Sequence, residues 1–214
     1  MSGLTDFQTD VARLFFSLPA SAGFLLAGGG ALLASGLTVR PTEDLDFFGE
    51  TGRSDVAAAR DQLETAVAAR GWSSTRLQDS ETFARLRLSG NDDLIVDIAI
   101  DSAAGRPPVV SLVGPTFDPE ELAGRKLTAL FDRAAARDFA DVFVLAERFG
   151  KSVILERAEE IDRGFDRQIL AEMLRTIGRF TDEELSVAPS QPATVRSFFD
   201  QWADELQAGD GDGE

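Results

Sequence analysis

Residues 24–48 read FLLAGGGALLASGLTVRPTEDLDFF, and the rest of the chain is organised around this stretch. We predict a short apolar strand from Phe24 to Ala27, a turn at Gly28 to Gly30, a short helix, and a second strand from Asp44 to Phe48. A glycine turn between a strand and a helix can present backbone N–H groups to phosphates. Followed some fifteen residues later by Asp-Leu-Asp, such a turn can hold a nucleoside triphosphate and its magnesium ions.

The composition is that of an ordinary globular protein. The chain has 214 residues, of which 43% are hydrophobic and 27% charged, which suggests one large domain or two small ones. No apolar run approaches the length of a membrane span, and the N-terminus has no signal-peptide pattern. We therefore expect a cytoplasmic protein that does not engage a membrane.

Three missing residue types narrow the chemistry. The sequence contains no Cys, no His and no Tyr. A thiolate nucleophile, a Ser-His-Asp triad and the usual zinc sites are thereby excluded. Any catalysis must use carboxylates, Lys, Arg, hydroxyl groups or a hard metal ion.

The net charge of −16 makes the chain a poor non-specific ligand for nucleic acid. A nucleic-acid substrate would have to meet a local basic patch. Among the 21 basic residues only Lys126 and Lys151 are lysines. The acidic end, Gly209 to Glu214, is typical of a disordered tail.

Periodicity and capping signals divide the chain into an α/β core over residues 1–115 and a helical region over residues 116–208. In the core we predict helices at 5–18 and at 54–70, the latter capped by Ser54, and strands at 72–77, 82–88, 94–100 and 107–113. In the helical region we predict helices at 118–132, started by Asp118, at 138–149, capped by Asp138, and at 151–163, 167–180 and 194–208.

Three aspartates could share a metal ion. Residues i and i+2 of a strand point to the same side, so Asp44 and Asp46 project together while Leu45 faces the core. Asp97 interrupts the buried-type strand 94–100 and is costly there unless it is paired or bound to metal. Asp101, at the end of that strand, fits a turn. The alternative is a solvated acidic face.

Two sequence blocks resemble one family. The first is Gly-Gly-x-Ala-Leu with Arg-x-Thr-x-Asp-Leu-Asp-Phe-Phe after it; the second runs from Glu121 through Arg125-Lys126-Leu-Thr-Ala-Leu to Arg137-Asp138 and Asp141. Together they are similar to the AbiEii/MenT nucleotidyltransferase toxins of type IV toxin–antitoxin systems, in the DNA polymerase β superfamily. Gly30 stands where many members have Thr, and Thr42 replaces the commoner Ser.

The resemblance implies an α+β fold, a polymerase-β-like mixed sheet with helices followed by an all-helical C-terminal half. It implies Mg²⁺ and an NTP co-substrate, transfer of NMP to the 3′ end of tRNA, and a cognate antitoxin. The implied metal ligands are Asp44, Asp46 and Asp97. The implied catalytic residues are these three with Lys126 and Asp138, and the implied phosphate-binding residues are Gly28, Gly29, Gly30, Arg40, Thr42, Lys126 and Arg137.

Several interpretations stay open at this point. Asp138 could be only a helix cap, Lys126 a surface residue, and Arg137 part of a solvated helical face. A small-molecule nucleotidyltransferase of the antibiotic-modifying type would suit the acidity better than a tRNA enzyme. A non-catalytic relative that binds only a nucleotide or a partner is the third possibility. The tRNA hypothesis predicts that Arg85, Arg87, Arg125, Lys126, Arg133 and Arg137 line the same cleft as Asp44.

Overall fold

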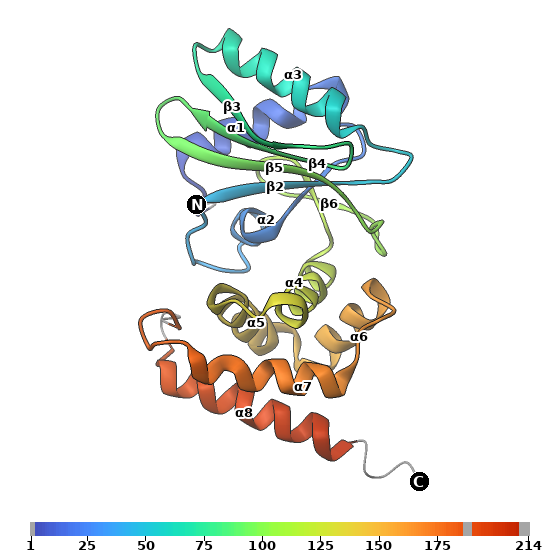
Figure 1. Ribbon diagram of the computed structural model, residues 1–214, viewed down its shortest axis with the longest axis vertical. Coiled ribbons are helices and arrows are strands. Elements are labelled where there is room, and N and C mark those ends of the chain that lie inside the picture. Colours follow the sequence, from blue (N-terminus) through green and yellow to red (C-terminus); the bar gives the residue numbers. More distant parts are fainter. Residues whose placement is uncertain (1–2, 186–189, 210–214) are drawn as a thin grey trace. The chain divides into compact units, whose positions relative to one another are not determined.

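The computed structural model describes residues 3–185 and 190–209. The chain divides into two compact units, Met1–Leu122 and Ala123–Glu214. Figure 1 traces the elements of both units along the sequence. Of the expected acidic tail, Gly209 is the last residue of a helix, and residues 210–214 lie outside the described part.

The first unit contains a mixed sheet of seven strands in the order β3-β4-β5-β2-β1-β7-β6. Its strands are β1 (Leu25–Ala27), β2 (Asp44–Glu50), β3 (Ser73–Asp79), β4 (Phe83–Ser89), β5 (Asp93–Asp101), β6 (Val109–Val110) and β7 (Pro115–Thr116). The predicted edge strand at 107–113 is therefore much shorter than expected, and a second short strand follows it. The α+β fold class inferred from the sequence is confirmed.

The centre of the sheet joins strands that are far apart in sequence. β2 pairs antiparallel with β1 and parallel with β5, and β7 pairs parallel with β1. Between β2 and β5 the chain forms α3 (Val56–Ala69) and the antiparallel strands β3 and β4. This crossover lets β5 return beside β2 in the same direction.

Three helices belong to this unit besides the start of α4. α1 (Asp6–Phe16) and α3 lie along one face of the sheet, whereas α2 (Gly28–Ala34) lies beside β1 and β2 (Figure 1). A capping box between Thr5 and Gln8 starts α1. The cap of α3 is Asp55 and not Ser54 as predicted: the Asp55 carboxylate accepts from the Ala58 N–H, whereas the Ser54 hydroxyl accepts from the Glu50 N–H.

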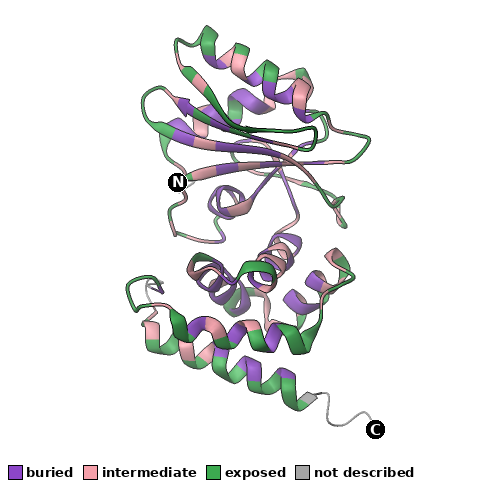
Figure 2. Ribbon diagram, viewed as in Figure 1, coloured by how far each residue is buried: buried purple, intermediate pink, exposed green. Residues whose placement is uncertain are grey.

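Burial alternates along β2 and β4, as Figure 2 shows. Leu45 and Phe47 of β2 are fully buried, and the Phe47 ring stacks on the Phe15 ring of α1 with centroids 3.9 Å apart. Residues at the intervening positions, Asp44 and Asp46 among them, are only partly buried. The core on the α1 and α3 side thus fixes which face of the sheet carries the carboxylates.

The second unit is helical. Its elements are α4 (Pro119–Arg133, whose first turn belongs to the first unit), α5 (Ala136–Phe149), α6 (Lys151–Ile161), α7 (Arg167–Arg175), the 3-10 turn η2 (Thr176–Arg179) and α8 (Pro192–Gly209). Asp118 caps α4 as predicted, because its carboxylate accepts from the N–H of Glu120. α5 begins earlier than predicted: Ala135 is its N-cap, so Asp138 lies inside the first turn and is not a cap.

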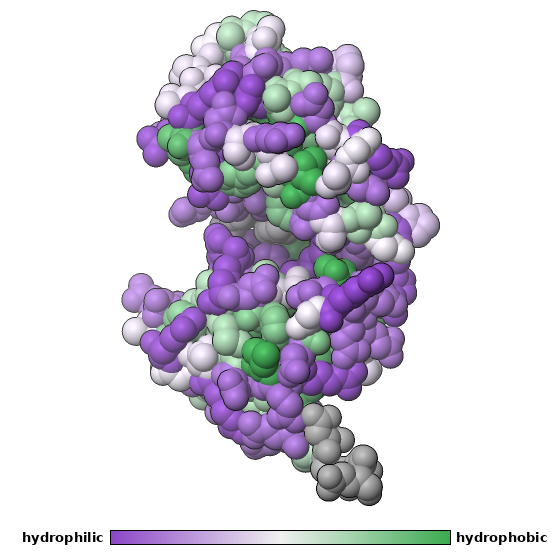
Figure 3. Space-filling view, turned by 45° about the vertical axis from the view of Figure 1, so that its right-hand side comes forward, coloured by the Kyte–Doolittle hydropathy of each residue, from purple (hydrophilic) through white to green (hydrophobic). Residues whose placement is uncertain are grey.

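Aromatic rings dominate the contacts between α5 and α8. Phe139 of α5 meets Phe199 of α8 edge to face with centroids 5.0 Å apart, and Trp202 is almost fully buried. The face seen in Figure 3 is mostly hydrophilic, with small hydrophobic patches between the charged residues. Within residues 3–185 and 190–209, none of the helices is both long and apolar enough to cross a membrane.

Candidate active site

The sheet brings together the three aspartates singled out by the sequence. In the parallel pairing of β2 with β5, Asp46 stands opposite Asp97 and Asp44 opposite Ile95. Side chains at paired positions of neighbouring strands point to the same face, so the carboxylates of Asp46 and Asp97 are adjacent. The predicted condition for a shared carboxylate site, that these two strands pair, is met.

The Thr42 side chain orients Asp44. Its Oγ1 donates to Asp44 Oδ1 at 2.6 Å, the short distance expected of a hydrogen bond to a charged acceptor. The loop that carries Thr42 is itself held to α1, since Gln8 Nε2 donates to the Thr42 carbonyl oxygen at 2.7 Å. Gln8 is almost fully buried. Arg40, in the same loop, donates from Nη1 to the Pro41 carbonyl oxygen at 3.0 Å.

The three glycines were predicted to form a turn before the helix, and this prediction is wrong. They are the first residues of α2 itself. Each lies close to a side chain of β2 or of the loop before it. A Cβ on Gly28 would collide with the Asp46 carboxylate, one on Gly29 would lie 2.7 Å from Thr42 Oγ1, and one on Gly30 would lie 2.8 Å from Leu45 Cδ2. Gly28 also has φ of +59°, a conformation that favours glycine. Glycine is therefore required at Gly28, whereas at Gly29 and Gly30 the nearest atoms belong to side chains that a larger residue would have to shift.

Arg85 of β4 holds Asp97 from the other side. The two residues are cross-strand partners, and the guanidinium binds the carboxylate with both arms: Nε to Oδ1 at 2.8 Å and Nη2 to Oδ2 at 2.6 Å. This hydrogen bonding to Asp97 is the main cause that raises the pKa of Arg85, and the charges of Asp44 and Asp46 add to it. Arg85 is thus a counter-charge for all three aspartates. From the sequence, Arg85 is predicted only as one of several basic residues in a surface patch, and its pairing with Asp97 is not.

Asp44, Asp46 and Asp97 are the predicted ligands of magnesium. Within residues 3–185 and 190–209, no group of three carboxylates is arranged to hold a metal ion. Asp97 forms an ion pair with Arg85. Asp44 and Asp46 remain two hard oxygen donors on one face of one strand. Mg²⁺ is commonly bound by one or two carboxylates together with substrate phosphates, so the pair fits such an ion. The role of Asp97 as a third ligand stays a prediction.

The remaining predicted residues lie in the helical unit, where Lys126 and Asp138 each form an ion pair. Lys126 Nζ of α4 lies 2.8 Å from Asp141 Oδ2 of α5, with the two side chains 9% and 0% exposed. Lys126 is thus a buried residue rather than a surface lysine. Asp138, also fully buried, accepts from Arg133 Nε at 2.8 Å and Nη2 at 2.9 Å. Arg137 lies on the exposed side of α5.

Comparison with known proteins assigns the chain to a family. Residues 13–211 match the model of the family "Nucleotidyl transferase AbiEii toxin, Type IV TA system". The chain belongs to the AbiEii nucleotidyltransferase toxin family. This confirms the resemblance carried by the two sequence blocks, and it makes the chain a nucleotidyltransferase of a toxin–antitoxin family. A search of curated proteins found no match.

Solved structures agree with the AbiEii family fold. A putative nucleotidyltransferase from Helicobacter pylori superposes with a TM-score of 0.59 at 17% identity, covering 96% of this chain and 98% of that one. JHP933 from Helicobacter pylori gives 0.56 at 19% identity, with 96% and 94% covered. MenT4, a nucleotidyltransferase toxin from Mycobacterium tuberculosis, gives 0.58 at 15% identity, with 94% and 85% covered. At these identities the likeness shows the fold alone.

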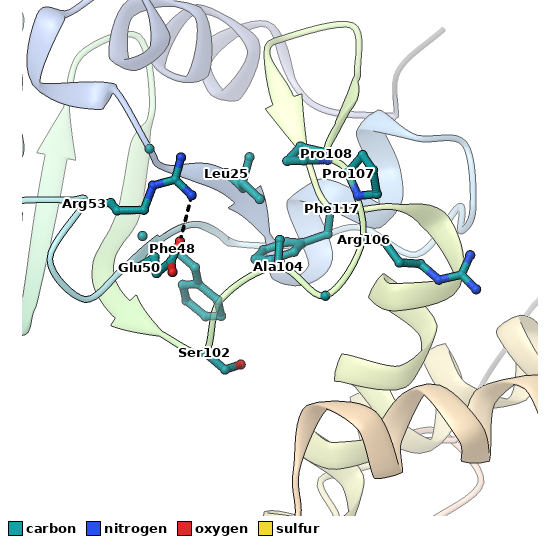
Figure 4. A pocket seen from close by; sticks show the side chains of 13 residues that line it. Leu25, Phe48, Glu50, Arg53, Ser102, Ala104, Arg106, Pro107, Pro108 and Phe117 are labelled. Atoms are coloured by element: carbon teal, nitrogen blue, oxygen red, sulfur yellow. Dashed lines mark hydrogen bonds and ion pairs between the residues drawn. The ribbon is translucent and has the colours of Figure 1, made fainter.

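Two pockets in the first unit flank the AbiEii motif strand β2. One, of about 620 Å³, adjoins the start of the strand and is lined by Thr42, Glu43, Arg87, Asp92 and Asp93 among others. The other, of about 380 Å³, lies at the far end of β2, with an apolar wall that includes Phe48 and Phe117 (Figure 4). There Arg53 is bound to Glu50. Only the first pocket adjoins the residues singled out by the sequence.

Proposed function

We propose that this protein transfers a nucleoside monophosphate from an NTP to the 3′ end of tRNA, with release of pyrophosphate, as the toxin of a toxin–antitoxin pair. The observation that carries the proposal is the placement of Asp44 and Asp46 on one face of β2 with Asp97 in register beside them. That placement occurs within the sequence block by which the chain resembles its family. A cognate antitoxin is the partner that this family assignment suggests.

The carboxylates would hold the metal and the triphosphate together. Bound Mg²⁺ supplies charge neutralisation at the phosphates and polarises the transferred group. Asp44 is oriented for this task by Thr42, and Asp46 by its contact with the start of α2. Asp97 would act near the acceptor hydroxyl, either as a ligand of the metal ion there or as the base that takes the proton of the attacking hydroxyl. Gly28, Gly29 and Gly30, with Arg40, would lie along the phosphates.

The helical unit would supply the positive charge. We propose that Lys126 contacts the nucleotide phosphates as a point charge, and that Arg137 assists it. Asp141 holds the Lys126 ammonium in place through the 2.8 Å ion pair. The role proposed for Asp138 becomes one of positioning, because its carboxylate is fully engaged by Arg133.

The acceptor is the finer part of the proposal. In a chain of net charge −16, a tRNA end would need the local arginines. Arg87 of β4 is the candidate in this unit, since it is exposed and shares a face of the strand with Arg85, which is itself bound to Asp97. A second candidate acceptor is a cationic small molecule, such as an aminoglycoside. It is favoured by the acidic residues Glu43, Asp92 and Asp93 in the pocket beside Thr42.

One labelling experiment separates these functions. The full-length protein is incubated with Mg²⁺, each α-labelled NTP in turn, total tRNA and an aminoglycoside, and every product is resolved. Label on the 3′ end of tRNA that disappears with Asp46→Asn supports the proposal. Label on the aminoglycoside alone overturns the tRNA acceptor, and no label with any NTP overturns catalysis and leaves a nucleotide-binding or partner-binding protein. Asp101→Asn, at the end of β5, is the matched control for loss of a carboxylate.

A further inference from the structure

The Arg85–Asp97 ion pair places a fixed positive charge beside the proposed metal ligands. Arg85 and Asp97 are directly opposed on β4 and β5, and Asp97 is directly opposed to Asp46 on β2. The three side chains therefore form one row across the open face of the sheet. Both oxygens of Asp97 accept from the guanidinium, at 2.8 Å and 2.6 Å.

An arginine cannot release its partner by losing a proton, because a guanidinium stays charged at any pH the protein experiences. Here the neighbouring carboxylates raise its pKa further. A cation that shares Asp97 therefore competes with the Arg85 guanidinium for the carboxylate, because both oxygens already accept hydrogen bonds from it. The Arg85 side chain is 45% exposed and Asp97 only 8%, so the arginine is the member of the pair with solvent into which it can move.

We propose that Arg85 is a positioning residue that sets the divalent-cation affinity of the site. It acts as a competing counter-ion that occupies Asp97 until the metal arrives with the nucleotide. The three carboxylates and the guanidinium together leave two net negative charges, enough for one divalent cation. Arg85 thus keeps the bare site from binding metal tightly before the substrate phosphates are present. This inference rests on the metal site of the proposed function.

The alternative is that Arg85 only stabilises the β4–β5 pairing. A cross-strand ion pair of this kind contributes a modest stability, and losing it would lower the melting temperature without strengthening metal binding. The two roles therefore predict different results when the Arg85 charge is removed. A competing counter-ion predicts that the nucleotide-free protein binds a divalent cation more tightly, whereas a purely structural role predicts no tightening. Removal of a unit charge a few ångströms from a bound cation changes that affinity by about tenfold or more.

The test measures Mn²⁺ binding to the full-length protein without nucleotide, from the electron paramagnetic resonance signal of free Mn²⁺. Arg85→Gln should tighten Mn²⁺ binding by about tenfold, and Arg85→Lys should change it less, because it keeps the charge. Arg87→Gln is the matched control, since Arg87 lies on the same face of β4 but opposite Ile95. It should change the affinity much less than Arg85→Gln does.

A double-mutant cycle assigns the effect to Asp97. If Arg85 acts through that carboxylate, the tightening caused by Arg85→Gln should be largely lost in the Asp97→Asn background. Melting curves on each variant establish that it is folded, and Arg85→Met, which also removes the charge, carries the test if Arg85→Gln is not folded. Equal or weaker Mn²⁺ binding by a folded variant that has lost the Arg85 charge would overturn the inference. Failure of every variant and of the natural protein to bind Mn²⁺, even with an NTP present, would instead overturn the proposed metal-dependent function.

Discussion

Lys126 Nζ lies 2.8 Å from Asp141 Oδ2, and the two side chains are 9% and 0% exposed. The resemblance to the AbiEii family made Lys126 a candidate ligand for phosphate, and its burial also gives it a structural task. A buried charge deprived of its partner is strongly destabilising, whereas removal of both charges together is often tolerated. Substitution of Lys126 alone therefore tests folding and catalysis at once.

We expect Lys126→Met to lower the free energy of unfolding by about 3–5 kcal/mol, because it leaves Asp141 buried without its ammonium partner. The double variant Lys126→Met with Asp141→Leu should recover most of that stability while remaining inactive in the labelling assay. Urea unfolding followed by circular dichroism measures the first quantity. An active double variant would show that Lys126 serves the fold and not the phosphates.

Gly28 and Gly36 provide a matched pair for the close packing of α2 on β2. Both have positive φ, +59° and +65°, but a Cβ on Gly28 collides with the Asp46 carboxylate, whereas one on Gly36 has nothing within 4 Å. Substitution by Ala should cost about 1–2 kcal/mol of backbone strain at either position. Only Gly28→Ala should also abolish nucleotide transfer, because it displaces Asp46. Equal activity of the two variants would contradict the proposed role of Asp46.

The Thr42 hydroxyl should matter for activity through Asp44. Thr42→Val keeps the shape of the side chain and removes the 2.6 Å hydrogen bond, whereas Thr42→Ser keeps a hydroxyl. We expect kcat/KM to fall by about tenfold in the valine variant, the value of one hydrogen bond to a charged group, and to change little in the serine variant. Steady-state kinetics on both variants decide the point. Similar kinetics for the two would show that Asp44 is oriented by other contacts.

A pH-dependent contribution to stability comes from Lys151 and Glu205, which join α6 to α8. The hydrogen bond from Lys151 at 2.7 Å is the main cause that lowers the pKa of Glu205 below its ordinary value of 4.5. A carboxyl group with a lowered pKa in the folded state stabilises the fold above its unfolded pKa, and this contribution is lost as the pH falls through the folded value.

Glu205→Gln should therefore lower the melting temperature by about 1–2 °C at pH 7, and by less as the pH falls through the lowered pKa of Glu205, because the native glutamate then becomes protonated. The size is small because Glu205 is 46% exposed. Asp200→Asn, in the same helix, controls for the loss of any acidic charge. A difference for Glu205→Gln that stays unchanged down to the lowest pH at which the protein remains folded would contradict the assignment to the ion pair.

The sequence predicts local geometry well wherever one strand or helix decides it. The alternation of Asp44, Leu45 and Asp46 places the two carboxylates correctly, and Asp118 caps α4 as its Pro-Glu-Glu sequel indicates. The prediction that Asp138 caps its helix is wrong. Alanines precede Asp138, and because they give no capping signal, the start of the helix is predicted too late in the sequence. There the N-cap position falls on Ala135.

What the sequence left open depends on pairings between distant segments. Arg85 and Asp97 are twelve residues apart, and only the register of β4 with β5 makes them partners. Likewise, the three glycines are predicted to form a turn because glycine is common in turns and rare inside helices. They are instead part of α2, where Asp46, Thr42 and Leu45 lie close to them. Such contacts carry no local signal in sequence.

The burial of Lys126 has a practical consequence, because the chain has only two lysines. Lys151 is 25% exposed and Lys126 is 9% exposed. An amine-acylating reagent should therefore modify Lys151 readily, and Lys126 only in those moments when the ion pair with Asp141 opens. The ratio of the two modification rates, measured by mass spectrometry, then reports how often the ion pair between α4 and α5 opens.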